Sequence, residues 1–454
     1  MTGHTTPRGF VPPGRAAAGA KDADEKDTRD TSVIDSVTVD IAWWSAGRGL
    51  SPITLSAFSL GFAIIAAVWL TGISAHADAV AFVALVASYV TCRTARYYSS
   101  GQLTAAADWA HGACALLAEL AVYAGIAGGV SANVAASAGT GLTGLIGDHL
   151  RGTFLASFGG SGPTGVWRLA IAAAILLAVR EMANICLAAA KERTAVIEGQ
   201  QTADRILVPA PASGARLVAL CVAVILVGAR GGFVLVLLLG VLALLIRIGV
   251  VGPNSGVIGY RGDGPLSVWI GSFVAGRLPP VPPLVVGLLV TGALTWLGMG
   301  NLSGILLLTP AEAMLLAALG CWHPHDGPRD WLAPALLQAG EYVFIAAVGF
   351  AGKVPAPVTF ALITGVIMRH FDLAYRARNQ VSPALFIRQA AKPPVLAGAD
   401  WRGLGWEGRM IVAGIAAAAG ILSFAFPLCA IYMWALLLRD AYIGWSAGHT
   451  TIDS

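Results

Sequence analysis

One apolar stretch of the 454-residue chain holds residue types that could do chemistry inside a membrane. Residues 108–129 read DWAHGACALLAELAVYAGIAGG, with Asp108 and His111 near the start and Glu119 in the middle. A carboxylate within a bilayer is costly, so it usually faces a partner or a water-filled cavity. Two interpretations of Glu119 follow. It binds a substrate or an ion, or it forms a hydrogen bond or an ion pair between helices, for which Arg96, Arg180 and Arg369 are the candidate partners.

A second stretch repeats this pattern. Residues 330–352 read DWLAPALLQAGEYVFIAAVGFAG, and Asp330 and Glu341 have the same spacing as Asp108 and Glu119. Arginines also recur in the same order in the two halves of the chain, at the ends of matching apolar segments: Arg180 and Arg369 at the fourth, Arg216 and Arg409 at the fifth, Arg247 and Arg439 at the sixth. This order predicts a diverged tandem duplication of a six-helix unit.

Further polar residues lie close to the ends of apolar segments. Arg369 and Asp372 belong to MRHFDLAYR, where they either bind phosphate or anchor a helix end at anionic lipid. The predicted polar site comprises Arg96, Asp108, His111, Glu119, Asp330, Glu341, Arg369 and Asp372. No residue is assigned a catalytic role. The scattered cysteines include no C-x-x-C pair, so neither a zinc knuckle nor a disulfide framework is predicted. No residue is assigned as a metal ligand.

The composition assigns the chain to the membrane. Hydrophobic residues make up 56% of the chain and charged residues 12%, whereas soluble domains contain about 25% charged residues. Residues 1–40 are polar and lack the apolar core of a signal peptide, which predicts a disordered cytoplasmic tail. The sequence has no basic arm for nucleic acid, so nucleic acid is not an expected partner.

Twelve apolar segments are candidate spans, because a membrane-spanning helix needs about 20 mostly apolar residues. They lie near residues 53–72, 79–94, 110–130, 165–188, 215–230, 232–250, 281–299, 301–320, 333–352, 356–374, 410–427 and 428–446. Most Lys and Arg residues then fall on one side, which predicts a multi-pass cell-membrane protein with both termini in the cytoplasm. The predicted fold is an all-α bundle of about 12 transmembrane helices in a 6+6 arrangement. Its parts are the tail, a module over residues 41–250, a linker over 251–280 and a second module over 281–454.

The N-terminal half of the chain resembles the CDP-alcohol phosphatidyltransferases. The likeness lies in SAGRGLSPITLSAFSLGFAIIAAVWLTG (45–72), TARYYSSG (94–101) and AELAVYAGIAGG (118–129). The second half is similar to a C-terminal domain of unknown function that accompanies such modules in actinobacterial proteins. That similarity lies in the stretches EYVFIAAVGFAG, MRHFDLAYR and GWEGRMIVAG.

The resemblance implies transfer of a phosphoalcohol from a CDP-alcohol to an acceptor hydroxyl, with release of CMP. Carboxylates of the family's D-G-x2-A-R-x8-G-x3-D-x3-D motif hold two divalent metals, so an active member would require Mg²⁺. Here Ala95–Arg96 match the A-R step, which places Thr91, Trp109 and Ala113 at three positions of the aspartates. Anchoring the motif on Glu119 instead places no aspartate at the last two positions either.

Three functions remain open from the sequence. The chain acts as a transferase on lipid or CDP-alcohol at the cytoplasmic leaflet, or it is a catalytically inactive partner or scaffold of a phospholipid synthase. The third is a transporter built from internal repeats. The expected partners are membrane lipid and either a CDP-alcohol or an active synthase. Whether the protein forms a homodimer is left open.

Overall fold

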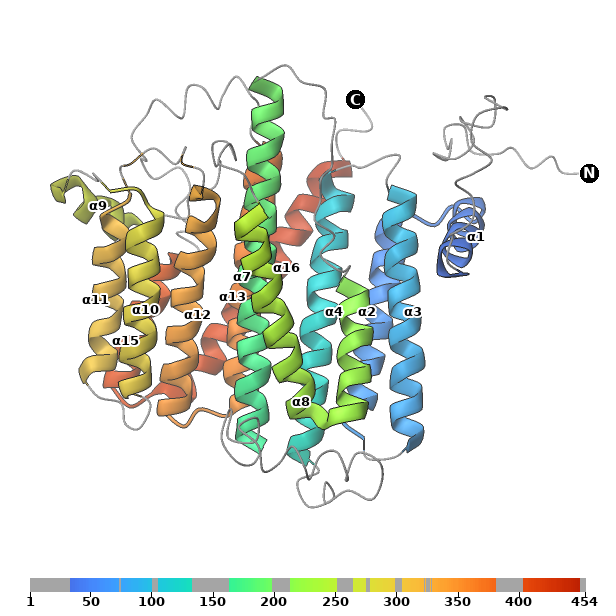
Figure 1. Cartoon of the computed structure of the whole chain (residues 1–454), viewed down its shortest axis with the longest axis horizontal. Helices are drawn as coiled ribbons and strands as arrows, with labels where there is room; N and C mark the ends of the chain where they lie inside the picture. The colour runs from blue at the N-terminus through green and yellow to red at the C-terminus, as the bar shows by residue number, and fades with distance from the viewer. Residues whose placement is uncertain are drawn as a thin grey trace, which may run out of the picture. The chain divides into compact units, whose positions relative to one another are not determined.

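The structure is a computed structural model of the whole chain. It describes residues 33–72, 75–99, 105–132, 163–197, 213–250, 264–274, 278–298, 304–321, 323, 327, 329–380 and 403–449. Every regular element within these ranges is a helix (Figure 1). The all-α class predicted from the sequence is therefore confirmed.

The helices of the N-terminal half are α1 (Val33–Gly47), α2 (Pro52–Trp69), α3 (Ala75–Ser99), α4 (Ala105–Ala132), α7 (Pro163–Ile197) and α8 (Ser213–Val250). Those of the C-terminal half are α9 (Pro265–Val274), α10 (Val281–Gly298), α11 (Gly304–Ala318), the 3₁₀ turn η2 (Asp330–Leu332), α12 (Ala333–Ala351), α13 (Ala356–Gln380), α15 (Gly405–Ala418) and α16 (Leu422–His449). Helix α1 begins inside the segment predicted as a disordered tail, and α9 lies inside the segment predicted as a linker.

The twelve apolar segments lie in helical regions, although 215–230 and 232–250 share α8, and 410–427 covers parts of α15 and α16. Not all of these helices are long enough to cross a membrane. Within the described ranges, eight helices have the length and hydropathy of a membrane span, and shorter apolar helices lie at 281–295 and 307–318. The predicted border near residue 427 is wrong. It lies inside α16, and the chain instead turns at Gly420, whose φ of 70° favours glycine.

The chain divides into two compact units. The first unit contains α1 to α4 and α8 as far as Gly228, and the second contains α7, the rest of α8 and all helices from α9 onwards. Gly228 interrupts α8 with a φ of 78° and a ψ of 167°. The boundary between the units therefore falls at a residue that breaks the helix.

Helix α2 is central to the first unit. It packs against α3 and α4, and α1 packs against α3. Gly125 and Gly129 of α4 form a G-x-x-x-G pair that meets the backbone of α2, because a Cβ at Gly125 would lie 2.5 Å from the carbonyl oxygen of Ala67. Small residues at this spacing let two membrane helices approach closely.

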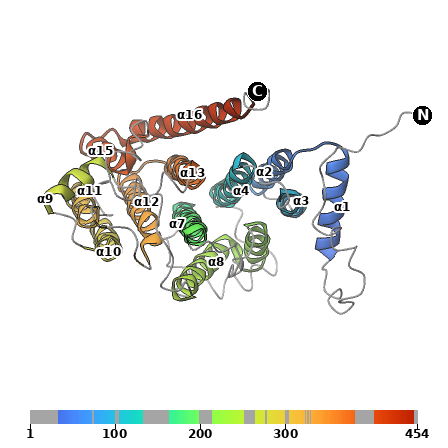
Figure 2. The same ribbon diagram turned by 90° about the horizontal axis from the view of Figure 1, so that it is seen from above.

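Helix α10 has the corresponding position in the second unit. It packs against α11 and α12, and α9 packs against α11; Figure 2 shows these helices gathered together. Helix α12 also contacts α13, α15 and α7, while α13 contacts α7 and α16. The core of this unit lies around α12 and α13, where long runs of side chains are buried.

A buried carboxylate holds α9 in place. Glu407, which is 1% exposed, accepts hydrogen bonds from the backbone N–H groups of Leu266 at 2.8 Å and Ser267 at 2.6 Å. These donors belong to the first turn of α9, whose N–H groups have no partner within the helix. An acidic group at a helix N-terminus also interacts favourably with the helix dipole.

Replacing Glu407 with alanine is expected to loosen α9 by removing both acceptors. Hydrogen bonds to a charged group contribute about 1.5–3 kcal/mol each, so we expect a stability loss of about 2 kcal/mol or more. Hydrogen–deuterium exchange of residues 264–274 should accelerate. The matched control is Ser272→Ala, which changes an exposed residue of the same helix. Equal exchange in both variants would show that the cap contributes nothing.

Candidate functional site

The carboxylate of Glu119 in the first unit is fully engaged. Arg216 of α8 donates from Nη2 to Glu119 Oε2 at 2.8 Å and from Nε to Oε1 at 3.2 Å, and Tyr123 donates its hydroxyl to Oε1 at 2.9 Å. Only 2% of the Glu119 surface is exposed. The two-pronged pairing satisfies the fork of the guanidinium and both carboxylate oxygens.

The same arrangement occurs in the second unit. Arg409 of α15 donates from Nε to Glu341 Oε1 at 2.5 Å and from Nη2 to Oε2 at 3.1 Å. Its Nη1 donates to the carbonyl oxygen of Gly403 at 2.7 Å. Glu341 is completely buried. The free-energy cost of removing its charge from water is offset when an oppositely charged partner and further hydrogen bonds are present.

His370 of α13 extends this second network. Its Nε2 lies 2.7 Å from Arg409 Nη2, and its Nδ1 lies 2.7 Å from the hydroxyl of Tyr342. Arginine has no acceptor, so Nε2 must accept and the ring proton resides on Nδ1, which donates to Tyr342. The geometry thus defines a neutral histidine that accepts from the same nitrogen of Arg409, Nη2, that also donates to Glu341.

A third group of charges lies next to His370 along α13. Arg369 Nη1 contacts Asp440 Oδ2 of α16 at 2.5 Å and Asp372 Oδ2 at 3.6 Å. Arg376 donates from Nε to Asp372 at 2.9 Å and from Nη2 to the carbonyl oxygen of Asp440 at 3.1 Å. Two cations and two carboxylates balance within this cluster, which ties α13 to α16.

The remaining predicted residues lie elsewhere. His111 Nδ1 is 3.3 Å from the hydroxyl of Ser56 in α2, and Arg96 and Asp108 lie near enough to act electrostatically on His111. In the second unit, Asp330 is buried and accepts a hydrogen bond from the N–H of Gly327 at 2.9 Å.

Within the second unit, Glu341 pairs with Arg409, whereas Arg369 contacts Asp372 and Asp440. Arg216 and Arg409 are not among the residues of the polar site predicted from the sequence, although they occupy matching positions in the two halves of the chain. The available signal was that each half carries one glutamate in its third apolar segment and one arginine opening its fifth. Because side-chain pairing across helices depends on their packing, that co-occurrence alone could not identify the partners.

The residues present do not fit the dinuclear magnesium centre that the resemblance implies. Thr91 Oγ1 hydrogen-bonds within its own helix to the carbonyl oxygens of Ala87 at 2.7 Å and Ser88 at 3.1 Å. Ala113 is buried, and Trp109 offers no oxygen. Magnesium binds hard oxygen ligands, carboxylates above all. Among the described residues, no group of three His, Cys, Asp or Glu side chains could hold a metal ion.

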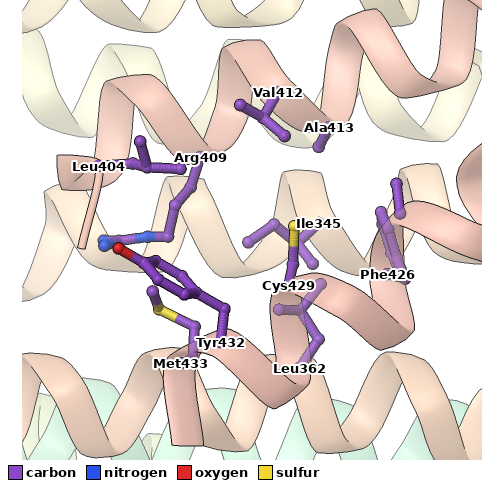
Figure 3. Close-up of a pocket in the computed structure, with 11 residues that line it drawn as sticks. Ile345, Leu362, Leu404, Arg409, Val412, Ala413, Phe426, Cys429, Tyr432 and Met433 are labelled. Atoms are coloured by element: carbon purple, nitrogen blue, oxygen red, sulfur yellow. The ribbon is translucent and has the colours of Figure 1, made fainter. Parts of the chain in front are cut away.

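A cavity lies beside Arg409 in the second unit. It is small, with a volume of about 30 Å³, and it lies among α12, α13, α15 and α16. Figure 3 shows Arg409 and the hydroxyl of Tyr432 at one end, whereas Val412, Ala413 and Phe426 lie toward the other. The wall of the cavity is almost entirely apolar.

These features define an all-helical protein with apolar helices of membrane length and buried charge pairs between them, which is the class of an integral membrane protein. Residues 259–450 match a family of unknown function (DUF5941), and this range includes every helix from α9 to α16. The similarity of the second half to a domain of unknown function is thus supported. No curated protein and no solved structure matches the chain.

Proposed function

We propose that the chain contains two diverged copies of one six-helix unit, with twelve membrane crossings and cytoplasmic termini. The order of helix packing supports this. Helix α2 contacts α3 and α4 while α1 contacts α3, and α10 contacts α11 and α12 while α9 contacts α11. In each set the preceding helix, α1 or α9, packs against the second of the following helices, α3 or α11.

The buried ion pairs give a second and independent argument for the repeat. The pair Glu119–Arg216 has its counterpart in Glu341–Arg409, although neither pairing is imposed by chain proximity. About three helical turns beyond each arginine the backbone bends at a glycine with positive φ, Gly228 in α8 and Gly420 between α15 and α16. Two copies of an ancestral unit would inherit both the pair and the bend.

We further propose that the protein is a catalytically silent relative of the CDP-alcohol phosphatidyltransferases, and that it acts at the cytoplasmic leaflet as an intramembrane partner of an active phospholipid synthase. The observation that carries this proposal is the content of the metal positions. Thr91, Trp109 and Ala113 take the places of aspartates, and Thr91 is engaged within its own helix. The fold would persist in such a relative because the charge pairs that join the helices do not need the metal.

The two intramembrane glutamates support a structural role over a ligand-binding one. Each is engaged on both oxygens by one arginine, so neither carboxylate offers an oxygen without an existing partner. A transporter that used Glu119 or Glu341 as an ion ligand would first have to break a two-pronged, buried charge pair. Breaking such a pair costs about 3–5 kcal/mol.

The proposal predicts that the purified protein releases no CMP. It is supplied with Mg²⁺, a panel of CDP-alcohols and membrane lipid, and CMP is measured over time next to an active CDP-alcohol phosphatidyltransferase in the same lipid. Membranes of cells that lack the protein are expected to make CMP more slowly than membranes that contain it. Restoring the wild-type chain should restore the rate.

Two results would contradict this reading. CMP released above background by the wild-type chain, and lost in Asp108→Asn, would establish an active transferase. An unchanged rate in membranes without the protein, across the whole panel, would refute the partnership with a synthase.

A further inference from the structure

A third glutamate in an apolar helix, Glu312 of α11, has a hydroxyl and not an arginine as its partner in the described part of the chain. Thr291 of α10 donates to Glu312 Oε2 at 3.1 Å. The other carboxyl oxygen, Oε1, is buried and has no hydrogen-bond partner among the described residues. It faces Gly287 of α10, where a Cβ would lie 3.9 Å away. The setting of Glu312 therefore differs from that of Glu119 and Glu341.

The helices around Glu312 offer it no counter-ion within the described ranges. Helix α11 packs against α9, α10, α12 and α15. Helices α9 and α10 contain no ionisable side chain, and Glu312 is the only one in α11. Those of α12 and α15 are bonded to other groups, and they are Glu341, Tyr342, Glu407 and Arg409. The only cation among them, Arg409, pairs with Glu341.

The cost of burying charge decides the protonation state. An isolated carboxylate is far more costly to move from water into apolar surroundings than a neutral carboxyl group. Glu119 and Glu341 are ionised because each pairs with an arginine, and Glu312 has only the hydroxyl of Thr291. We propose that Glu312 and Thr291 form a proton-binding site between α10 and α11, and that Glu312 holds its proton at neutral pH.

The site lies at the lipid-facing side of α11. Leu308 and Leu315 are on the same face of the helix as Glu312, because they precede and follow it by about one turn. They are 66% and 55% exposed, and apolar side chains this exposed on a membrane helix contact lipid. The Glu312 side chain is itself partly exposed. An apolar reagent dissolved in the bilayer can therefore reach its carboxyl group, whereas Glu119 and Glu341 are buried.

A proton site must also exchange with water, and α11 is short enough for this. Its 15 residues extend about 22 Å, less than the hydrocarbon core of about 30 Å. Glu312 lies about 9 Å from the C-terminal end of the helix at Ala318. Pro310 also lies inside α11, and short or proline-interrupted helices accompany ion sites in many transporters. The proposal is independent of the partnership with a synthase.

The test uses dicyclohexylcarbodiimide, an apolar reagent that labels protonated carboxyl groups in membranes. The carboxyl O–H adds across one C=N bond of the carbodiimide, and the adduct rearranges to a stable N-acylurea. The full chain is reconstituted in phosphatidylcholine vesicles, and mass spectrometry locates the modified residues. Glu312→Gln is the matched variant without the acid, and Glu119 and Glu341 are paired carboxylates of the same molecule that serve as internal references.

We expect Glu312 to be labelled at neutral pH about tenfold or more above Glu119 and Glu341, because their arginines favour the ionised form. Labelling should fall as the pH is raised, since an ionised carboxylate does not react. Thr291→Val should leave Glu312 labelled at an alkaline pH at which the wild type is no longer labelled. The hydroxyl of Thr291 donates to the carboxyl group and so favours its ionised form. A glutamate that only packs α10 against α11 would not respond to Thr291→Val in this way.

Infrared spectroscopy gives a second measurement that does not depend on access of the reagent. The C=O stretching band of a protonated carboxylic acid, present in the wild type and absent from Glu312→Gln, would support the proposal even without labelling. Absence of both the band and the labelling would overturn it, and so would equal labelling of all three glutamates. Protection of Glu312 by Na⁺ at constant pH would also overturn it and would assign the site to sodium. These outcomes are independent of whether the protein releases CMP.

Discussion

Replacing Arg409 with methionine is expected to destabilise the second unit by about 3–5 kcal/mol, because the substitution leaves the charge of Glu341 buried without its partner. The carboxylate is completely buried, and it receives two hydrogen bonds from Arg409. His370 would lose its donor as well. Unfolding of the purified protein in mixed detergent micelles, followed by tryptophan fluorescence, would measure the change.

The matched control removes both charges. Glu341→Gln in the Arg409→Met background should recover most of the loss, since a neutral amide is far less costly to bury than an unpaired carboxylate. Arg216→Met, at the corresponding pair of the first unit, should cost less, because the Arg216 side chain is 15% exposed and that of Arg409 is 7% exposed. If Arg409→Met and the double variant were equally unstable, the ion pair would not be the reason.

Gly125→Ala is expected to separate α4 from α2 and to lower stability by about 1–3 kcal/mol. A Cβ at this position would lie 2.5 Å from the carbonyl oxygen and 2.7 Å from the Cα atom of Ala67. Both are backbone atoms, which cannot yield as a flexible side chain does. The unfolding midpoint in detergent gives the size of the effect, and a double Gly125→Ala, Gly129→Ala variant should be worse.

A neighbouring glycine provides the control with the opposite sign. A Cβ at Gly128 would meet only Cγ2 of Thr71, at 3.7 Å, which is an ordinary van der Waals contact. Alanine has a higher helix propensity than glycine, so Gly128→Ala should stabilise α4 by up to about 1 kcal/mol. Equal effects of the two substitutions would mean that helix propensity, and not the approach of α2, governs this face.

The sequence alone determined the class of the protein and the existence of its helices. Apolar segments of spanning length and a low charged fraction leave few alternatives, because a backbone in lipid must satisfy its hydrogen bonds internally. It also located the glutamates at 119 and 341 and the arginines at 216 and 409 as matching landmarks. Local pattern suffices for such features, since each depends on residues near one another in the chain.

Tertiary structure decided what those residues do. Ninety-seven positions separate Glu119 from Arg216 and 68 separate Glu341 from Arg409, so only the packing of α4 with α8 and of α12 with α15 shows that each glutamate meets an arginine. The turn at Gly420 and the capping of α9 by Glu407 likewise depend on contacts distant in sequence. The cavity beside Arg409 follows from four helices together. Its walls are ordinary apolar residues, and a sequence does not record the space between them.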